Sequence, residues 1–386
     1  MSTSLSRHSR LSAVVVTATT LATAVALTLT AVGAAQGRAR TGALAARPSA
    51  SRAMTHVVAT GLNNPRQLSF DRAGRLFVAE AGKGGKGPCF KGGDGTVQCY
   101  GTTGSISRVE GRLTHRVVRG LPSLAGKGGT SAIGPSDLIL GPRGHYTLSI
   151  GLGNNPATRA KLPRSGRFMD TLSTGRLGHR SIHVLANLGH FEATHDPDHA
   201  GPDSDPVGFV RGRGGFVLTD AGGNDLLRVG PGGAVRTLAV FGTRKEPSPF
   251  GGPDIDMQAV PTSVVRGPDG AFYISQLTGF PFPVGAARIY RWVPGHAPRI
   301  FARGLTNVTD LAWRGHRLYA VQIADHGLLA PGVPIGSLVR VRPGHTAMTV
   351  AHLRAPYGVA IRGGSAYVST CTVCRGTGKV VRIQLP

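Results

Sequence analysis

One phrase recurs along this chain, and it restricts the fold more than any other feature. It consists of a small turn residue, a short apolar strand, a turn that usually contains glycine, and a second strand rich in β-branched and aromatic residues. Clear copies begin at Asn64, Pro261 and Pro356. Such self-similarity marks stacked supersecondary units, and four-stranded units are typical of a β-propeller. The phrase therefore predicts an all-β chain.

The number of repeats and the two ends of the repeat region predict how the ring closes. Six inner strands can be counted, beginning near Pro65, Pro135, Pro206, Pro261, Val308 and Pro356. The last repeat supplies only three strands, and a lone strand precedes the first repeat. We therefore predict a six-bladed β-propeller over residues 55–386, with the ring closed by the N-terminal strand pairing with the last blade, so that no blade edge stays unpaired.

The N-terminal segment has the features of an export signal. Basic residues come first, residues 11–35 carry no charge, and small-residue cleavage sites follow. The sequence predicts a signal peptide over 1–35, with cleavage as late as 45, then a disordered lead-in over 36–54. An uncleaved membrane anchor is the alternative, because the uncharged run is long. We expect a secreted, extracytoplasmic protein with no membrane span after cleavage.

The four cysteines bear on redox state. They are Cys89, Cys99, Cys371 and Cys374, and all lie in the mature part. In an oxidising exterior two disulfides are favoured, most simply Cys89–Cys99 and Cys371–Cys374. A Cys₄ zinc site and disulfides that bridge the first and last blades are the alternatives.

The charge of the chain restricts its partners. The formal net charge is +25 at pH 7. A basic surface of this kind favours an anionic envelope polymer as partner. The alternative is an Arg-rich compositional bias, because the basic residues are scattered singly and form no run. No nucleic-acid-binding motif is present, so a nucleic-acid partner is not expected.

Insertions are concentrated in the connections that leave one face of a propeller. They lie between second and third strands or between successive blades, whereas the turns on the opposite face stay short. Long loops on one face of a rigid scaffold usually carry function. We expect this long-loop face to bind an unknown small molecule or protein.

Acidic residues are unusually dense in one of these loops. Five of the 19 acids lie within residues 192–205, and the next inter-blade loop adds Asp254 and Asp256. Carboxylates this close repel each other unless a cation or arginines neutralise them, and a Ca²⁺ ion or other divalent cation binds several such oxygens. The alternative is Asx turns with salt links to Arg211 or Arg213. The spacing matches no EF-hand.

Polar residues also open the inner strands and face the central channel, where propellers commonly hold a ligand. Waters and backbone groups that satisfy these side chains are the alternative. The metal candidates from loop and channel together are Asp137, Asp203, Asp205, Asp254, Asp256 and Asp310. The candidates for the ligand-binding face are Asn63, Asn64, Asn224, Thr262, Asn307, Phe280 and Phe282. The two phenylalanines form either an apolar lip or a cover over their blade.

Several phrases of the chain resemble the ScyD/ScyE family of exported bacterial proteins over roughly residues 55–386. They include Gly61-Leu62-Asn63-Asn64-Pro65-Arg66, Asp220-Ala221-Gly222-Gly223-Asn224-Asp225 and Leu277-Thr278-Gly279-Phe280-Pro281-Phe282-Pro283. The resemblance implies a six-bladed propeller of NHL repeats, and the family has no established biochemical role. A weaker resemblance to regucalcin and gluconolactonase propellers lacks the Glu that those enzymes place on the first inner strand, where this chain has Asn63-Asn64-Pro65.

Three functions follow from these features. The first is an exported binding or scaffold propeller of the ScyD/ScyE family without catalytic activity. The second is a metal-dependent hydrolase or lactonase of the gluconolactonase type, in which the ion polarises a carbonyl group. The third is binding to an anionic envelope polymer. We expect the first, and the sequence assigns no catalytic residue.

Overall fold

A computed structural model describes residues 55–92, 95–179 and 181–386 of the chain. The predicted signal peptide and lead-in lie outside the described residues. Among the described residues, no helix has the length and apolarity needed to cross a bilayer.

The described part of the chain forms six sheets of four or five strands, as the repeats predicted, and one separate hairpin. The first three blades follow one another from the first repeat onwards. Their strands are β2 (Pro65–Phe70), β3 (Leu76–Glu80), β5 (Val97–Glu110) and β6 (Leu113–Ala125), with β4 (Cys89–Lys91) added to β5; β7 (Pro135–Leu140), β8 (His145–Ile150), β9 (Thr171–Arg176) and β10 (Ile182–Asn187); and β11 (Pro206–Gly212), β12 (Gly215–Asp220), β13 (Asp225–Val229) and β14 (Val235–Val240).

The remaining blades use the C-terminal half of the chain and the first strand. Their strands are β17 (Pro261–Arg266), β18 (Phe272–Gln276), β19 (Ala287–Trp292) and β20 (Arg299–Leu305); β21 (Val308–Arg314), β22 (Arg317–Gln322), β23 (Ile335–Arg340) and β24 (Met348–Arg354); and β25 (Val359–Arg362), β26 (Ser365–Thr370), β27 (Gly378–Gln384) and β1 (Thr55–Leu62). Connections carry α1 (Leu188–His195), the short helices η1 (Lys127–Gly129), η2 (Pro142–Gly144), η3 (Pro156–Lys161) and η4 (Arg164–Phe168), and the hairpin β15 (Arg244–Glu246) and β16 (Ile255–Met257).

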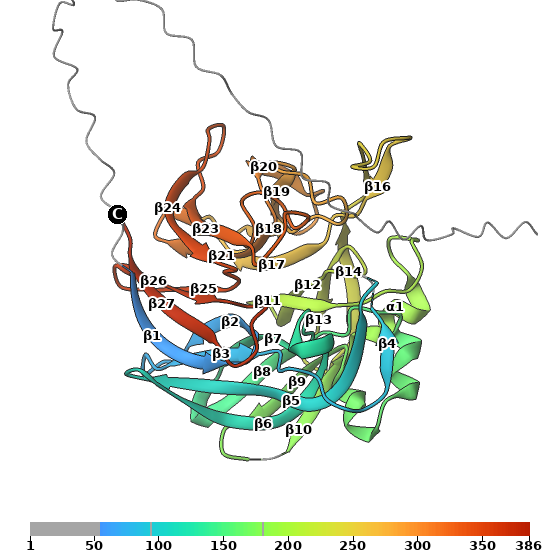
Figure 1. Cartoon of the computed structure of the whole chain (residues 1–386), viewed down its shortest axis with the longest axis vertical. Helices are drawn as coiled ribbons and strands as arrows, with labels where there is room; N and C mark the ends of the chain where they lie inside the picture. Colours follow the sequence, from blue (N-terminus) through green and yellow to red (C-terminus); the bar gives the residue numbers. More distant parts are fainter. Residues whose placement is uncertain (1–54, 93–94, 180) are drawn as a thin grey trace, which may run out of the picture. The chain divides into compact units, whose positions relative to one another are not determined.

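The inner strands contact one another in a closed order. β2 contacts β7, and the contacts continue through β11, β17, β21 and β25 back to β2. Figure 1 shows these strands around the centre of the ring that the blades form. Apolar residues of neighbouring sheets pack between the blades, as Phe77 with Leu148 and Val217 with Phe272 illustrate. Facing sheets exclude water in this way, and their burial supplies most of the favourable free energy of folding.

The N-terminal strand lies beside the last strand of the chain. β1 pairs with β27 in antiparallel register, with Thr55 opposite Ile383 and Leu62 opposite Gly378. Ala59 and Leu62 are fully buried. β1 and β27 are thus paired, and closure of the ring by this pairing stays a prediction.

Both disulfides join the simplest predicted partners. Cys89 binds Cys99, which links β4 to β5, and Cys371 binds Cys374 in the loop before β27. This pairing is confirmed, so the cysteines form neither a zinc site nor a bridge between blades. Two disulfides fit an oxidising environment.

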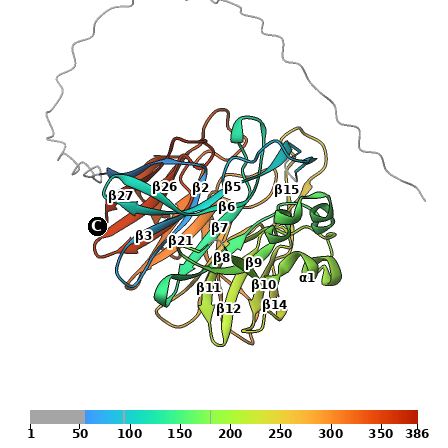
Figure 2. The ribbon, with the colours of Figure 1, turned by 90° about the horizontal axis from the view of Figure 1, so that it is seen from below.

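The long connections of the first three blades contact one another. The side chain of Asn154 donates to the carbonyl of Lys91 at 2.9 Å, and the backbone of Gly153 donates to Ser204 at 2.9 Å. Figure 2 shows α1, the short helices of the second blade and β15 on the same side of the sheets. We call this side the long-loop face.

Candidate metal centre

Eight carboxylates gather on the long-loop face around the third blade. They interact electrostatically in one connected group, which we call the acidic cluster, and they are Asp170, Glu192, Asp196, Asp198, Asp203, Asp205, Asp220 and Asp225. These are eight of the 19 acidic residues of the chain. Asp170 precedes β9, Glu192 lies in α1, Asp220 ends β12 and Asp225 begins β13. The other four lie between α1 and β11.

The backbone around α1 presents its acidic residues together. Asn187 caps the first turn of α1 by accepting a hydrogen bond from the backbone of His190 at 3.1 Å. Asp196 ends the helix in the left-handed conformation, with φ of 41°. The chain therefore turns back sharply after α1, and Glu192, Asp196 and Asp198 come close together.

The inner part of the acidic cluster is a pair of carboxyl groups that share one hydroxyl. Ser204 contacts both Asp170 and Asp220 through its side-chain oxygen. One hydroxyl hydrogen serves only one of them, so the other carboxyl group needs a proton or a cation. Burial raises the pKa of Asp170 well above its usual value, and the charge of Asp220 raises it further. Burial also raises the pKa of Asp220 to about 6. This inner pair therefore favours a shared proton near neutral pH.

The outer part of the cluster lacks positive partners. Oxygen atoms of Glu192, Asp196 and Asp198 lie within 4.8 Å of one another. Asp225 is fully buried, and neither of its carboxylate oxygens has a hydrogen-bond partner; the same holds for Oε1 of Glu192. Buried carboxylates are costly unless they are paired or bind a metal ion. Burial first, then the charges of Asp220 and Glu192, raise the pKa of Asp225 well above its usual value.

Glycines make room for the buried carboxylates. A Cβ atom at Gly223 would lie 2.9 Å from Oε2 of Glu192. A Cβ at Gly189 would lie 1.9 Å from Oδ2 of Asp170. A side chain at either position would displace the carboxylate next to it. The absence of a side chain at Gly189 and Gly223 therefore leaves the space that the carboxylates of Asp170 and Glu192 occupy.

Glu80 shows how the same chain satisfies a buried carboxylate without an ion. It is fully buried on β3, and its Oε2 accepts hydrogen bonds from Arg116 at 2.8 Å and from the backbone of Asn63 at 2.6 Å. Ser105 donates to Oε1 at 2.9 Å. Within the described residues, no member of the acidic cluster has an ion pair of this kind. The cluster therefore differs in kind from a structural carboxylate.

The alternative to a metal ion, Asx turns with arginine salt links, is present only in part. Asp196 accepts from the backbone of Gly201 at 3.2 Å, and Asp198 accepts from Ala200 at 2.9 Å. Arg211 and Arg213 instead line a groove at the ends of β12 and β13 that are opposite Asp220 and Asp225. The Asx turns therefore leave the carboxylate charges uncompensated. An all-oxygen donor set of this kind suits a hard cation such as Ca²⁺.

Asp137 and Asp310 connect neighbouring blades. Oδ2 of Asp137 accepts from the backbone of Phe209 at 2.9 Å, and Oδ2 of Asp310 accepts from that of Val359 at 2.7 Å. Their Oδ1 atoms are also engaged, by Leu138 and by Ser263, each at 2.7 Å. Burial raises the pKa of Asp137 to about 8 and that of Asp310 to about 7. These hydrogen bonds favour a structural role for Asp137 and Asp310 over metal binding.

Arg66 is a channel residue that the sequence reasoning did not single out. Its guanidinium group donates to the carbonyl of Thr372 at 3.0 Å and lies 4.7 Å from the ring centroid of Tyr357. Nε2 of Gln67 also lies 3.5 Å from the carbonyl of Thr262 on the fourth blade. Large side chains therefore occupy the channel. The only sequence signal was the position of Arg66 in the recurrent inner-strand phrase.

The predicted asparagines mainly support loops. Asn64, Asn224 and Asn307 are buried and have positive φ angles. Asn64 donates to the carbonyl of Gly82 at 2.7 Å, and Asn307 donates to that of Leu277 at 2.8 Å. Asn224 is the member that contacts the acidic cluster, because it donates to Oδ2 of Asp198 at 2.8 Å.

The remaining candidates lie away from the acidic cluster. The backbone of Asn63 binds Glu80, and the hydroxyl of Thr262 donates to the carbonyl of Val308 at 2.8 Å. Asp254 directly precedes β16 and Asp256 lies within it; both are exposed, and Asp256 pairs with Lys245 of β15 at 2.8 Å.

The two predicted aromatic residues lie together on the long-loop face. Phe280 is 41% exposed and stacks on Phe250, with ring centroids 6.1 Å apart. Phe282 packs edge-on against Phe280. This exposure favours an apolar lip over a buried cover.

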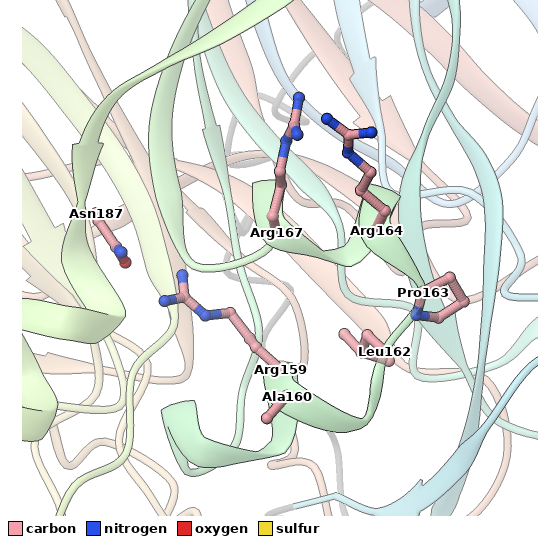
Figure 3. Close-up of a pocket in the computed structure, with 7 residues that line it drawn as sticks. All are labelled: Arg159, Ala160, Leu162, Pro163, Arg164, Arg167 and Asn187. Atoms are coloured by element: carbon pink, nitrogen blue, oxygen red, sulfur yellow. The ribbon is translucent and has the colours of Figure 1, made fainter.

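A small basic pocket lies beside the acidic cluster. Its volume is about 330 Å³, and Arg159, Arg164, Arg167 and Asn187 supply its polar groups. Figure 3 shows the guanidinium groups of Arg164 and Arg167 side by side, while Arg159 points towards Asn187. Burial raises the pKa of Asp170, and the charge of Arg159 offsets part of that rise. Positive and negative groups thus adjoin on the long-loop face.

In the presence of a chelator, the melting temperature should fall as the pH rises from about 5 to about 8. Burial raises the folded-state pKa values of Asp137, Glu192 and Asp205 to about 8, whereas unfolded carboxyl groups titrate near pH 4. The folded protein therefore binds more protons across this window, and its stability decreases with pH. Thermal denaturation in EGTA buffers at several pH values checks this. A melting temperature that rises with pH over the window would contradict it.

No family model and no curated protein matches the chain. Among solved structures, a protein of unknown function from Dyadobacter fermentans is 11% identical, with a TM-score of 0.48 over 86% of this chain and 98% of that chain. A second, from Bacteroides thetaiotaomicron, is 10% identical, with a TM-score of 0.46 over 86% and 75%. A putative glucose dehydrogenase from Thermus thermophilus is 14% identical, with a TM-score of 0.36 over 86% and 99%. These similarities are too distant to indicate a function.

Proposed function

We propose that this chain is an exported binding or scaffold propeller of the ScyD/ScyE type, and that a Ca²⁺-like divalent cation in the acidic cluster organises its long-loop face. One observation carries the proposal. Asp225 is fully buried with both carboxylate oxygens unpartnered, and it interacts electrostatically with Glu192 and Asp198, whose carboxylates converge with that of Asp196. A divalent cation satisfies several such oxygens at once and removes their mutual repulsion.

In this proposal the cation has a structural role and not a catalytic one. Glu192 belongs to α1, Asp196 and Asp198 to the following loop, and Asp225 to β13. An ion bound to these groups would join α1 and its loop to the third blade. The neighbouring basic pocket and the lip formed by Phe250 and Phe280 would then be held on a fixed surface for a partner.

The channel gives no support to a hydrolase. Both oxygens of Asp137 and of Asp310 are engaged in hydrogen bonds that join blades or adjacent residues. Gln67 also reaches from the first blade to the carbonyl of Thr262 on the fourth, so its side chain crosses the channel. A general base has to reach its substrate, and these acids are already committed. We therefore favour a role without catalysis.

Export is part of the proposal. The two disulfides fit an oxidising compartment, and the N-terminal residues have the charge and apolar pattern of a signal peptide.

Thermal denaturation with and without Ca²⁺ tests this function. Ligand at about 100 times its Kd stabilises the folded state by about 2.7 kcal/mol, which corresponds to a rise of about 4 °C in the Tm of a domain of this size. We expect that rise when millimolar Ca²⁺ replaces EGTA at about pH 7.5. The same Tm in both buffers would contradict the proposal.

A further inference from the structure

We propose that a groove between the third and fourth blades binds an anionic polysaccharide. The groove lies at the ends of the strands opposite the acidic cluster, because Asp220 and Asp225 stand at one end of β12 and β13, and the groove residues Gly214 and Arg228 lie towards the other. It is therefore distinct from the metal centre, and it has a volume of about 1210 Å³. A single ion occupies far less space, so the groove suits an extended chain.

The groove is strongly and uniformly basic. Sixteen residues line it, and its charged members are Arg211, Arg213, Arg228, Arg236 and Arg266. The chain as a whole has 44 basic residues among 386, which would place about two in a set of sixteen. No acidic residue lines the groove. This concentration argues against a mere compositional bias at this surface.

The arginine charges are not neutralised within the protein. Arg228 donates to the backbone carbonyls of Arg213 and Gly214, at 3.3 and 3.2 Å. Arg211 lies 5.4 Å from the ring centroid of Phe216. Among the described residues, none of the five arginines forms an ion pair with a carboxylate. Their charge is available to a partner, and guanidinium groups bind carboxylates and sulfates in a bidentate manner.

The floor of the groove favours sugar over nucleic acid. Phe272 and Trp292 line it but are only 6% and 4% exposed, because they pack into the core between the two blades. Proteins that bind single-stranded nucleic acids offer exposed aromatic faces on which bases stack. An anionic polysaccharide carries its charged groups on the outside of its sugar rings. Its charges could contact the arginines while its rings lie over the apolar residues of the groove. Exported proteins meet such polymers at cell envelopes.

Binding to polygalacturonate and to dextran sulfate, measured at low salt in EGTA, tests this inference. The two polymers distinguish carboxylate from sulfate recognition, and EGTA separates the result from the metal centre. The test variant is R213Q/R236Q/R266Q, whose three side chains are exposed. The matched control is R112Q/R342Q/R354Q, which removes the same charge from exposed positions outside the groove.

We expect the groove variant to bind at least one of the two polymers about tenfold more weakly than the unaltered protein, and the control variant to bind within about twofold of it. Equal losses in both variants would overturn the inference, because attraction would then be diffuse. No binding of the unaltered protein to either polymer would also overturn it. A groove-dependent preference for single-stranded DNA would overturn the assignment to polysaccharide.

Discussion

Deletion of residues 55–62 is expected to leave a protein that is insoluble or that melts about 7 °C or more below the intact chain. These residues form β1, which pairs with β27 from Thr55 to Leu62. The deletion would remove the buried side chains of Ala59 and Leu62 and uncover Val380 and Val381. Lost apolar burial and lost strand pairing together amount to about 5 kcal/mol or more. The deletion would also leave β27 as a free edge.

Circular dichroism during heating measures this effect, and deletion of residues 36–54 alone is the control. The control should melt like the intact chain. A synthetic peptide of residues 55–62 should restore part of the lost Tm, since it can occupy the vacated edge. A soluble deletion variant with an unchanged Tm would show that β1 does not stabilise the ring.

The architecture was predictable from the sequence because its signals are local. Each blade repeats a short pattern of strands and tight turns, so counting copies gave six blades. The disulfides join cysteines only ten and three positions apart, which made the simplest pairing the correct one. The acidic run from Glu192 to Asp205 also marked the region of the cluster.

The complete acidic cluster was not predictable, because its members come from separate segments. Asp170 precedes β9, and Asp220 and Asp225 flank the turn between β12 and β13. Only the folded blades bring these groups to the loop after α1. Asp254 and Asp256 of the next inter-blade loop were expected to join the metal site, but this depended on the path of that loop. The β15–β16 hairpin instead places Asp256 beside Lys245.

The double substitution E192Q/D225N is expected to weaken Ca²⁺ binding and, in the absence of Ca²⁺, to stabilise the folded protein. Loss of two charged ligands should weaken Ca²⁺ binding by about 100-fold or more, since ligand charge sets the affinity of such sites. The same substitution should raise the Tm in EGTA at about pH 8. Unaltered Asp225 is buried without a partner, so the folded protein has to protonate it or bury its charge.

Glu80→Gln is the matched control for this pair of effects. It alters another fully buried carboxylate, but one that already pairs with Arg116 at 2.8 Å. We expect a lower Tm in EGTA, because Arg116 would lose its partner, and an unchanged rise on addition of Ca²⁺. If E192Q/D225N also destabilised the protein in EGTA and kept the full Ca²⁺ response, the acidic cluster would be an ordinary structural network.

Equilibrium dialysis of the purified protein against Ca²⁺, with E192Q/D225N in parallel, tests the central claim most directly. A site built from Glu192, Asp196, Asp198 and Asp225 predicts a single tightly bound Ca²⁺ per chain at about pH 7.5, and its loss in the variant. No bound ion at millimolar free Ca²⁺, or binding that the variant retains in full, would contradict the account.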